Sequence, residues 1–116
     1  MEVFKRVEKP WDREIWIAVT DKYALKIIEI RKGTRASLQC HAKKHEHIYV
    51  DSGTLQMEWE SEDRKMVTLM LKAGELIEVK PGCKHRASAP EDVRLIEVST
   101  PEMDDVVRIQ DDFKRK

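Results

Sequence analysis

The central part of the chain is a succession of short runs in which apolar residues alternate with polar ones or follow one another directly. Runs such as EIWIAV, YALKIIEI, TLQMEWE and VRLIEV have the length of strands and are rich in Ile and Val. Turn-like segments such as RKGT, DSG and KPGCK separate them. Short runs with regularly spaced turn signals predict an all-β barrel or sandwich built from antiparallel strands.

Two hairpins are predicted within this pattern. One is HIYVDSGTLQM, with an Asp-Ser-Gly turn between alternating segments, and the other is MEWESEDRKMVTL, whose charged middle forms the turn. The only helix-like candidate is residues 100–113, where Thr100 is a possible N-cap and Pro101 lies in the first turn. The same residues could instead form an extended strap across the barrel, and the pattern leaves both structures open.

Length and charge restrict the classes of function. A chain of 116 residues suffices for one domain with one modest core. Lys plus Arg and Asp plus Glu number 22 each, so no overall charge attracts nucleic acid or an anionic membrane. The chain has no apolar run long enough to span a membrane and no signal-peptide pattern, so we expect a cytoplasmic protein. In that compartment Cys40 and Cys83 are expected to be free thiols.

The segment SLQCHAKKHEHIYVDSG holds three of the four histidines. Residues two apart in a strand share a face, so Gln39 and His41 point the same way. Glu46 begins the next strand, and His85 follows a Pro-Gly turn far along the chain. Two imidazoles, a carboxylate and an amide oxygen suit Zn, Mn, Fe, Co or Ni and leave coordination positions open. These four residues are the predicted metal ligands.

Neighbouring histidines and the tryptophans have simpler explanations than ligand binding. His45 is expected in the turn, and His47 has the opposite strand parity to Glu46, which favours a surface or dimer-contact role. Trp11, Trp16 and Trp59 are explained more simply as core or interface residues than as stacking partners of a sugar.

The spacing of these residues resembles the two cupin motifs. Gly33, Gln39-x-His41, Glu46 and Gly53 follow the first motif, with Gln in place of its first histidine, and GELIEVKPGCKH resembles the second. The ordered set KPW, SLQ-x-H, EH, SGT, KHR, IEV and DDVVR is similar to the C-terminal domain of type II phosphomannose isomerases. Those bifunctional enzymes pair this domain with a mannose-1-phosphate guanylyltransferase. The resemblance covers nearly the whole chain.

This resemblance implies a single cupin domain over residues 1–116, a double-stranded β-helix or jelly-roll barrel with a short C-terminal tail across it. It implies one divalent transition metal at the four ligands, with Zn²⁺ as first choice and Mn, Co, Ni or Fe as alternatives. It also implies a sugar phosphate as substrate, namely mannose 6-phosphate or fructose 6-phosphate, and a homodimer.

A phosphorylated sugar requires cations near the metal. Arg35 and Lys44 flank the ligand hairpin, and Lys84 and Arg86 flank the last ligand, so these four are the predicted phosphate contacts. Arg108 matches the arginine of the family's tail motif and is the predicted catalytic contact. The general base stays open between an activated water, Glu97 and a lysine of lowered pKa.

Several positions depart from the family pattern. Lys44 replaces an arginine, Ile48 replaces an aromatic residue, and the segment before DDVVR is shortened. We expect a metal-dependent isomerase that interconverts mannose 6-phosphate and fructose 6-phosphate. One alternative is a non-catalytic cupin that binds a sugar, sugar phosphate or nucleotide sugar. A second is an Fe(II)-dependent dioxygenase, because two His, one Glu and open positions on iron can also activate oxygen.

Overall fold

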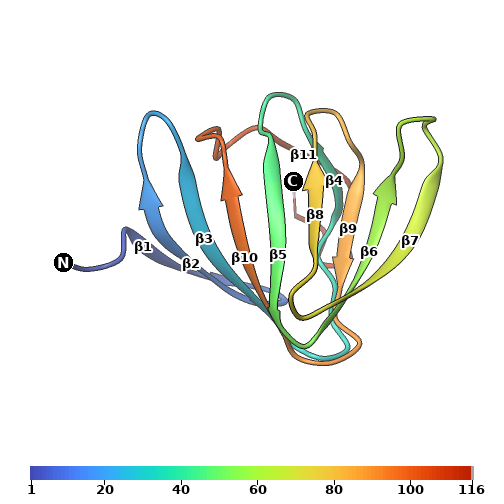
Figure 1. The fold of residues 1–116 in the computed structure, drawn as a ribbon, viewed down its shortest axis with the longest axis horizontal. Helices are drawn as coiled ribbons and strands as arrows, with labels where there is room; N and C mark the ends of the chain where they lie inside the picture. Colours follow the sequence, from blue (N-terminus) through green and yellow to red (C-terminus); the bar gives the residue numbers. More distant parts are fainter. Residues whose placement is uncertain (116) are drawn as a thin grey trace.

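The computed structural model describes residues 1–115, which form two antiparallel sheets and contain no helix (Figure 1). One sheet has the strand order β1-β2-β3-β10-β5-β8 and the other the order β11-β4-β9-β6-β7. The strands are β1 (Lys5–Lys9), β2 (Asp12–Val19), β3 (Ala24–Ile30), β4 (Leu38–His41), β5 (Glu46–Ser52), β6 (Thr54–Glu60), β7 (Met66–Lys72), β8 (Leu76–Val79), β9 (His85–Ser88), β10 (Val93–Ser99) and β11 (Val106–Gln110). The predicted all-β, antiparallel architecture is confirmed.

Only one of the two predicted hairpins forms. β6 and β7 pair along their whole length, from Thr54 opposite Lys72 to Glu60 opposite Met66. β5 and β6 do not pair, because β5 lies between β10 and β8 in one sheet while β6 lies between β9 and β7 in the other. The Asp-Ser-Gly turn therefore carries the chain from one sheet to the other, and the prediction of a hairpin there is wrong.

Alternation along the strands builds the core. On β10, Leu95 lies opposite Ile28 of β3 and Val50 of β5, and all three side chains are buried. Leu55 and Met57 of β6 face them from the other sheet and are fully buried. Burying a side chain of this size contributes about 1.5–3 kcal/mol relative to leaving it exposed. Apolar burial therefore holds the two sheets together.

The interior changes from apolar to ionic toward one end of the barrel. Two residues beyond Leu95 on the same face of β10, Glu97 lies opposite Lys26 of β3, and both side chains are buried. Glu46, at the start of β5, is also buried. This end carries the β4–β5 and β8–β9 loops, at the top of Figure 1. Buried charges at one end of a barrel require partners or a ligand, so this end is the candidate site.

The tail is an extended strap rather than a helix. β11 pairs antiparallel with β4, which places Val106 opposite His41 and Arg108 opposite Gln39. The backbone groups of the tail are thereby satisfied by the edge of β4, and the helical alternative is wrong. Cys40 and Cys83 are free thiols, as expected.

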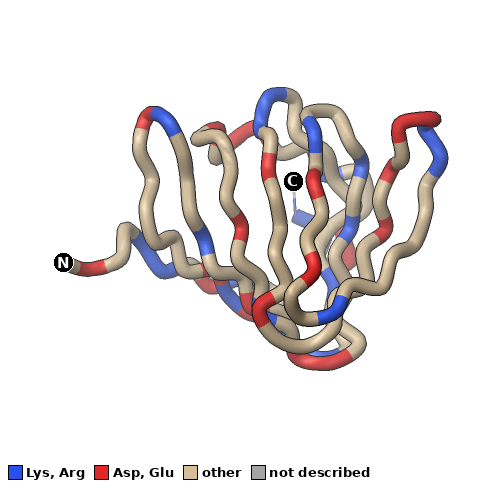
Figure 2. The backbone as a smooth tube through the Cα atoms, viewed as in Figure 1, with Lys and Arg blue, Asp and Glu red and all other residues tan. Residues whose placement is uncertain are grey.

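Basic residues (Lys, Arg) and acidic residues (Asp, Glu) are interspersed along the strands and in the loops of both ends (Figure 2). In the part of the chain that the structure describes, no helix has the length and apolar character needed to cross a membrane.

Gly53 is required where the chain crosses between sheets. Its φ is +82°, and a Cβ at this position would collide with the backbone oxygen of Asp92. We expect Gly53→Ala to lower the free energy of unfolding by about 2–4 kcal/mol, combining left-handed strain with overpacking. Gly33 has the same φ, but a Cβ there would meet no described atom within 4 Å, so Gly33→Ala is a matched control. Urea unfolding measures both; equal losses would contradict the role of the Asp92 contact.

Candidate metal centre

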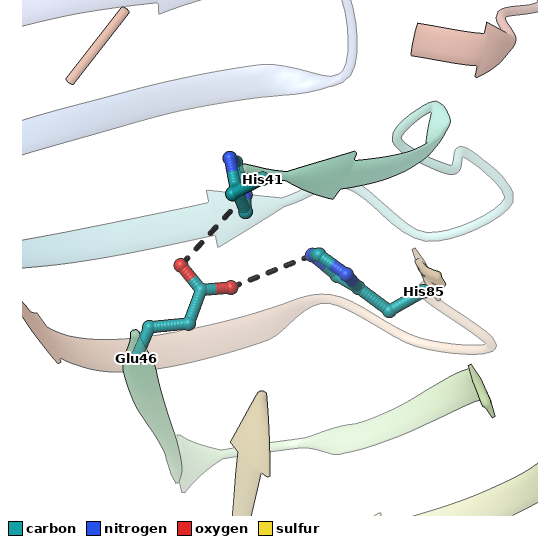
Figure 3. Close-up of side chains that lie close together, drawn as sticks. All are labelled: His41, Glu46 and His85. Atoms are coloured by element: carbon teal, nitrogen blue, oxygen red, sulfur yellow. Dashed lines mark ion pairs between the residues drawn. The ribbon is translucent and has the colours of Figure 1, made fainter. Parts of the chain in front are cut away.

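Three predicted ligands meet inside the polar end of the barrel (Figure 3). His41 ends β4, Glu46 begins β5 and His85 begins β9, and all three are buried. Glu46 Oε1 lies 3.4 Å from His85 Nε2, and Glu46 Oε2 lies 4.0 Å from His41 Nε2. One ligand atom from each residue lies within 4.8 Å of the others. The carboxylate thus lies between two imidazoles that come from the opposite sheet.

Each histidine has an acceptor behind its ring. His85 Nδ1 is 3.0 Å from the carbonyl oxygen of Cys83, which leaves Nε2 directed at Glu46. His41 Nδ1 is 3.3 Å from Asp105 Oδ1. Carbonyl or carboxylate acceptors of this kind fix the tautomer and orientation of metal-binding histidines.

Asp105 also holds the loop that carries the ligands. Its Oδ2 accepts hydrogen bonds from the backbone N–H groups of Lys43, at 2.7 Å, and Lys44, at 3.0 Å. Burial alone would raise the pKa of Asp105, but these two donors outweigh it and lower the pKa. An anionic tail residue therefore positions both the loop and the His41 ring.

The protonation states suit metal binding. Burial, reinforced by the positive charge of Lys44, lowers the pKa of His41 to about 4, so its imidazole is neutral at pH 7. Burial would raise the pKa of Glu46, but its contact with His85 and the charge of Lys44 hold the pKa well below its usual range. Neutral imidazoles and an ionised carboxylate are the forms that bind metals.

A buried ionic network adjoins the ligands. Lys44 Nζ lies 2.9 Å from Glu46 Oε2 and 3.4 Å from Glu97 Oε2, while Lys26 Nζ lies 3.5 Å from Glu14 and 3.9 Å from Glu97. Three carboxylates thus accompany two ammonium groups, and ionisation of all three would leave one negative charge to attract a cation. Burial and the neighbouring charge of Glu46 raise the pKa of Glu97 to about 7.

The residues present fit a divalent transition metal. Within residues 1–115, Nδ1 of buried His41 faces Asp105 Oδ1 at 3.3 Å without the geometry of a hydrogen bond, and its Nε2 has no hydrogen-bond partner. An unsatisfied buried polar atom costs about 1–3 kcal/mol, and coordination through Nε2 would remove that cost. Two imidazoles and a carboxylate are a ligand set that Zn²⁺ and its first-row neighbours accept.

Gln39, the predicted fourth ligand, lies beside this group. The sheet register places it between His85 of β9 and Arg108 of β11. Its Oε1 accepts a hydrogen bond from the hydroxyl of Ser37 at 2.7 Å, which orients the amide. Gln39 lines the same cavity as the three ligands, and its coordination of the metal stays a prediction.

A cavity of about 470 Å³ opens over the ligands. Pockets that bury small molecules typically have about 300–1,000 Å³. Beside the ligands, its walls include the side chains of Trp11 and Trp16 and the carboxylates of Glu14, Glu97 and Asp104. Its cationic lining consists of Lys9, Lys26, Lys44, Arg108 and Arg115.

Of the predicted phosphate contacts, the structure brings only Lys44 to the cavity, and its ammonium group is engaged by two carboxylates. The predicted catalytic contact, Arg108, also lines the cavity. Arg35 binds Asp112 through two hydrogen bonds of 2.6 and 2.9 Å at the surface, and Lys84 is exposed. Neither of these two lines the cavity.

Arg86 has a structural role in the strap. It is buried, and its guanidinium donates to the backbone oxygen of Ala36 at 3.2 Å and of Gln110 at 3.1 Å. These bonds tie the end of β11 to the barrel, so the side chain is engaged outside the cavity.

Three cations of the cavity lining were not predicted as site residues. Lys9 belongs to the KPW segment, whose resemblance to the family was the only available signal. Arg115 is held by Asp111 through side-chain hydrogen bonds of 2.8 and 3.3 Å, and its segment DDFKR only approximates the aspartate, tyrosine, glycine, arginine ending of the family. Lys26 interrupts the apolar inner face of β3, and a charged residue at an inward-facing position is a signal in the sequence that could have identified it as a site residue.

Comparison with known proteins gives a consistent result. The family model "Mannose-6-phosphate isomerase C-terminal" matches residues 1–111. The mannose-1-phosphate guanylyltransferase of Escherichia coli (strain K12) is 31% identical over 118 residues, covering 97% of this chain and 24% of that protein. The xanthan biosynthesis protein XanB of Xanthomonas campestris is 29% identical over 116 residues, covering 96% of this chain and 24% of that protein. The chain spans about a quarter of the length of the curated relatives it matches.

Solved structures share the fold. An RmlC-like cupin from Shewanella frigidimarina superposes with a TM-score of 0.75 and 20% sequence identity, covering 87% of this chain and 86% of that one. At this level of identity the likeness concerns the fold, and it confirms the predicted cupin barrel.

Proposed function

Because the chain belongs to the family of mannose-6-phosphate isomerase C-terminal domains, we propose that it is a metal-dependent isomerase that interconverts mannose 6-phosphate and fructose 6-phosphate. The observation that carries the proposal is the buried group of His41, Glu46 and His85 at a cavity of suitable volume for a sugar phosphate. The description of the family supports the reaction, and the geometry supports the choice of residues.

The reaction moves one proton from C2 to C1 of the sugar and a second proton from the C2 hydroxyl to the C1 oxygen, while negative charge develops on the carbonyl oxygen. A divalent metal held by His41, Glu46 and His85, with Gln39 as fourth ligand, would polarise that carbonyl and stabilise the charge. Glu97 faces the same cavity, and its pKa of about 7 suits a group that accepts and returns a proton at neutral pH. We assign the proton transfer to Glu97.

Cations from three separate segments line the cavity and are assigned to the substrate's phosphate: Lys9 from β1, Arg108 from β11 and Arg115 from the tail. Burial lowers the pKa of Lys9, and the charges of Lys26, Arg115 and Arg108 add to this effect. The charged form of Lys9 would therefore be stabilised when a dianion enters among these cations. Arginine supplies paired donors to phosphate and lysine a point charge.

We expect Lys9→Met to raise the KM for mannose 6-phosphate roughly 10- to 100-fold, because a hydrogen bond to a charged group contributes about 1.5–3 kcal/mol. The kcat should change less, since the phosphate is remote from the reacting carbons. Inorganic phosphate should inhibit the variant more weakly by a similar factor. Lys32→Met, which removes an exposed lysine outside the cavity lining, is the matched control. An unchanged KM in Lys9→Met would contradict the assignment.

The proposed activity is tested by a coupled assay for fructose 6-phosphate formed from mannose 6-phosphate. The protein is stripped of metal under anaerobic conditions and reloaded separately with Zn²⁺, Mn²⁺, Co²⁺, Ni²⁺ and Fe²⁺. Metal-dependent turnover supports the proposal. Stoichiometric loading without turnover by any metal contradicts it and favours a non-catalytic, ligand-binding cupin; turnover of another substrate that requires both O₂ and Fe²⁺ favours the dioxygenase alternative.

A further inference from the structure

A second group of metal-binding side chains lies on the outer surface of the barrel. It consists of His45, His47 and Glu78, and none of them lines the inner cavity. Glu46 and His47 are neighbours in β5, so their side chains point to opposite faces of the sheet. Glu78 of β8 lies directly opposite His47 in the register of the two strands. The outer group is therefore separated from the inner ligands by the sheet itself.

The backbone fixes His45 beside this strand pair. Its N–H donates to the hydroxyl of Thr100 at 3.0 Å, and its carbonyl oxygen accepts from the N–H of Thr100 at 3.0 Å. The residue just before β5 is therefore anchored at both backbone groups. Its ring is turned to the same side as that of His47, with ring centroids 5.5 Å apart.

The three side chains converge on one carboxylate oxygen. Glu78 Oε2 lies 2.7 Å from His45 Nε2 and 3.7 Å from His47 Nε2, and one ligand atom from each residue lies within 4.8 Å of the others. Ligand atoms around a tetrahedral Zn²⁺ are separated by roughly 3.3–3.5 Å, given bonds of about 2.0–2.2 Å. Small side-chain rotations would therefore bring all three to an ion, with the His45–Glu78 hydrogen bond exchanged for coordination.

Charge and exposure also suit a cation. The hydrogen bond from His45 lowers the pKa of Glu78, so its carboxylate is ionised at neutral pH. All three side chains are roughly two-fifths exposed, which leaves room for water on the open side of an ion. Lys80, whose positive charge acts on Glu78, is itself paired with Glu62 at 3.6 Å.

We propose that His45, His47 and Glu78 form a second, solvent-facing site for a divalent transition metal of the Zn²⁺ or Ni²⁺ type. Two imidazoles and one carboxylate supply three ligands, and solvent supplies the rest. This site does not depend on the proposed isomerase activity, because it shares no residue with the inner centre.

The test is the number of Zn²⁺ ions bound by the whole, chelator-treated protein at equilibrium dialysis, measured by elemental analysis. We expect two equivalents for the wild-type protein and one for the double variant His45→Gln/His47→Asn. His85→Ala should also bind one equivalent, held by the outer site. Asp51→Asn, which changes an exposed carboxylate further along the outer face of β5, should still bind two.

The variants separate this proposal from the one for the inner centre. Loss of one equivalent in His45→Gln/His47→Asn supports the outer site, even if the inner site proves to bind nothing. A wild-type stoichiometry that the double variant leaves unchanged overturns the outer site, whatever the activity of the protein. Circular dichroism of each variant confirms that the strands are intact before the metal is counted.

Discussion

Replacing His85 with alanine is expected to empty the inner metal site and to reduce isomerisation to the background rate. His85 Nε2 faces Glu46 Oε1 at 3.4 Å, and its Nδ1 is already engaged by a carbonyl oxygen, so no neighbouring group replaces it. Mutating a residue that only holds a metal ligand in place typically lowers metal affinity or activity 10- to 100-fold, and removing the ligand itself lowers them further. In the His45→Gln/His47→Asn background, the metal content should fall from one equivalent to none.

Thermal unfolding gives a readout besides activity. A ligand that binds only the folded state raises its stability by RT ln(1 + [L]/Kd), so Zn²⁺ should raise the Tm of the background protein but not that of His85→Ala. Cys83→Ser is the matched control: it changes a free thiol two residues away and keeps the backbone carbonyl that orients His85. Full metal content and turnover in His85→Ala would remove this residue from the proposed centre.

The sheet architecture was predictable because strand parity is a local property. Alternation in β3, β5 and β10 placed Ile28, Val50 and Leu95 on the inner face, where the structure buries them. Which strands pair with one another was less predictable. A short turn after β5 favoured a hairpin, but the buried face of β6 is completed by β7 and β9 in the other sheet. Local turn chemistry cannot reveal which sheet offers the better packing.

The ligands were predictable for a different reason, since their spacing resembled a known motif. The residues that would contact the substrate were not predictable in this way. Arg35 and Arg86 stand beside the ligand segments in sequence, but Arg35 binds Asp112 and Arg86 binds the backbone of the strap. Both partnerships depend on where the tail crosses the barrel. The sequence favours a solvated or helix-start role for Asp105, whereas the structure gives it a contact with the ligand loop that joins residues 61 and 62 positions apart.

Lys44 shows how burial changes the meaning of a charge. In the sequence it belongs to a Lys-Lys turn and could equally have been a solvated residue or a phosphate contact. In the fold it is buried between Glu46 and Glu97, and these carboxylates raise its pKa despite its burial. A cation beside a metal ligand reduces the attraction for a divalent ion, and the carboxylates of Glu97 and Glu14 offset this repulsion.

Replacing Glu97 with glutamine is expected to lower kcat by about 10²- to 10⁴-fold, the usual contribution of a positioned acid or base. The carboxylate faces the cavity, and its pKa of about 7 lets it take up and release a proton at neutral pH. Exchange of the C2 hydrogen of mannose 6-phosphate with D₂O should be lost to the same extent. The zinc content of the inner site should be retained, because no ligand is removed.

An electrostatic role for Glu97 has to be separated from proton transfer, because the same carboxylate pairs with Lys44 and Lys26. Glu14→Gln is the matched control, since Glu14 is also buried, lines the same cavity and pairs with Lys26. Removing either carboxylate leaves a buried ammonium group less compensated, so both variants should lose stability. Only Glu97→Gln should lose hydrogen exchange. If both variants lose exchange and kcat equally, the network sets the electrostatics of the site and the transferred proton belongs to another group.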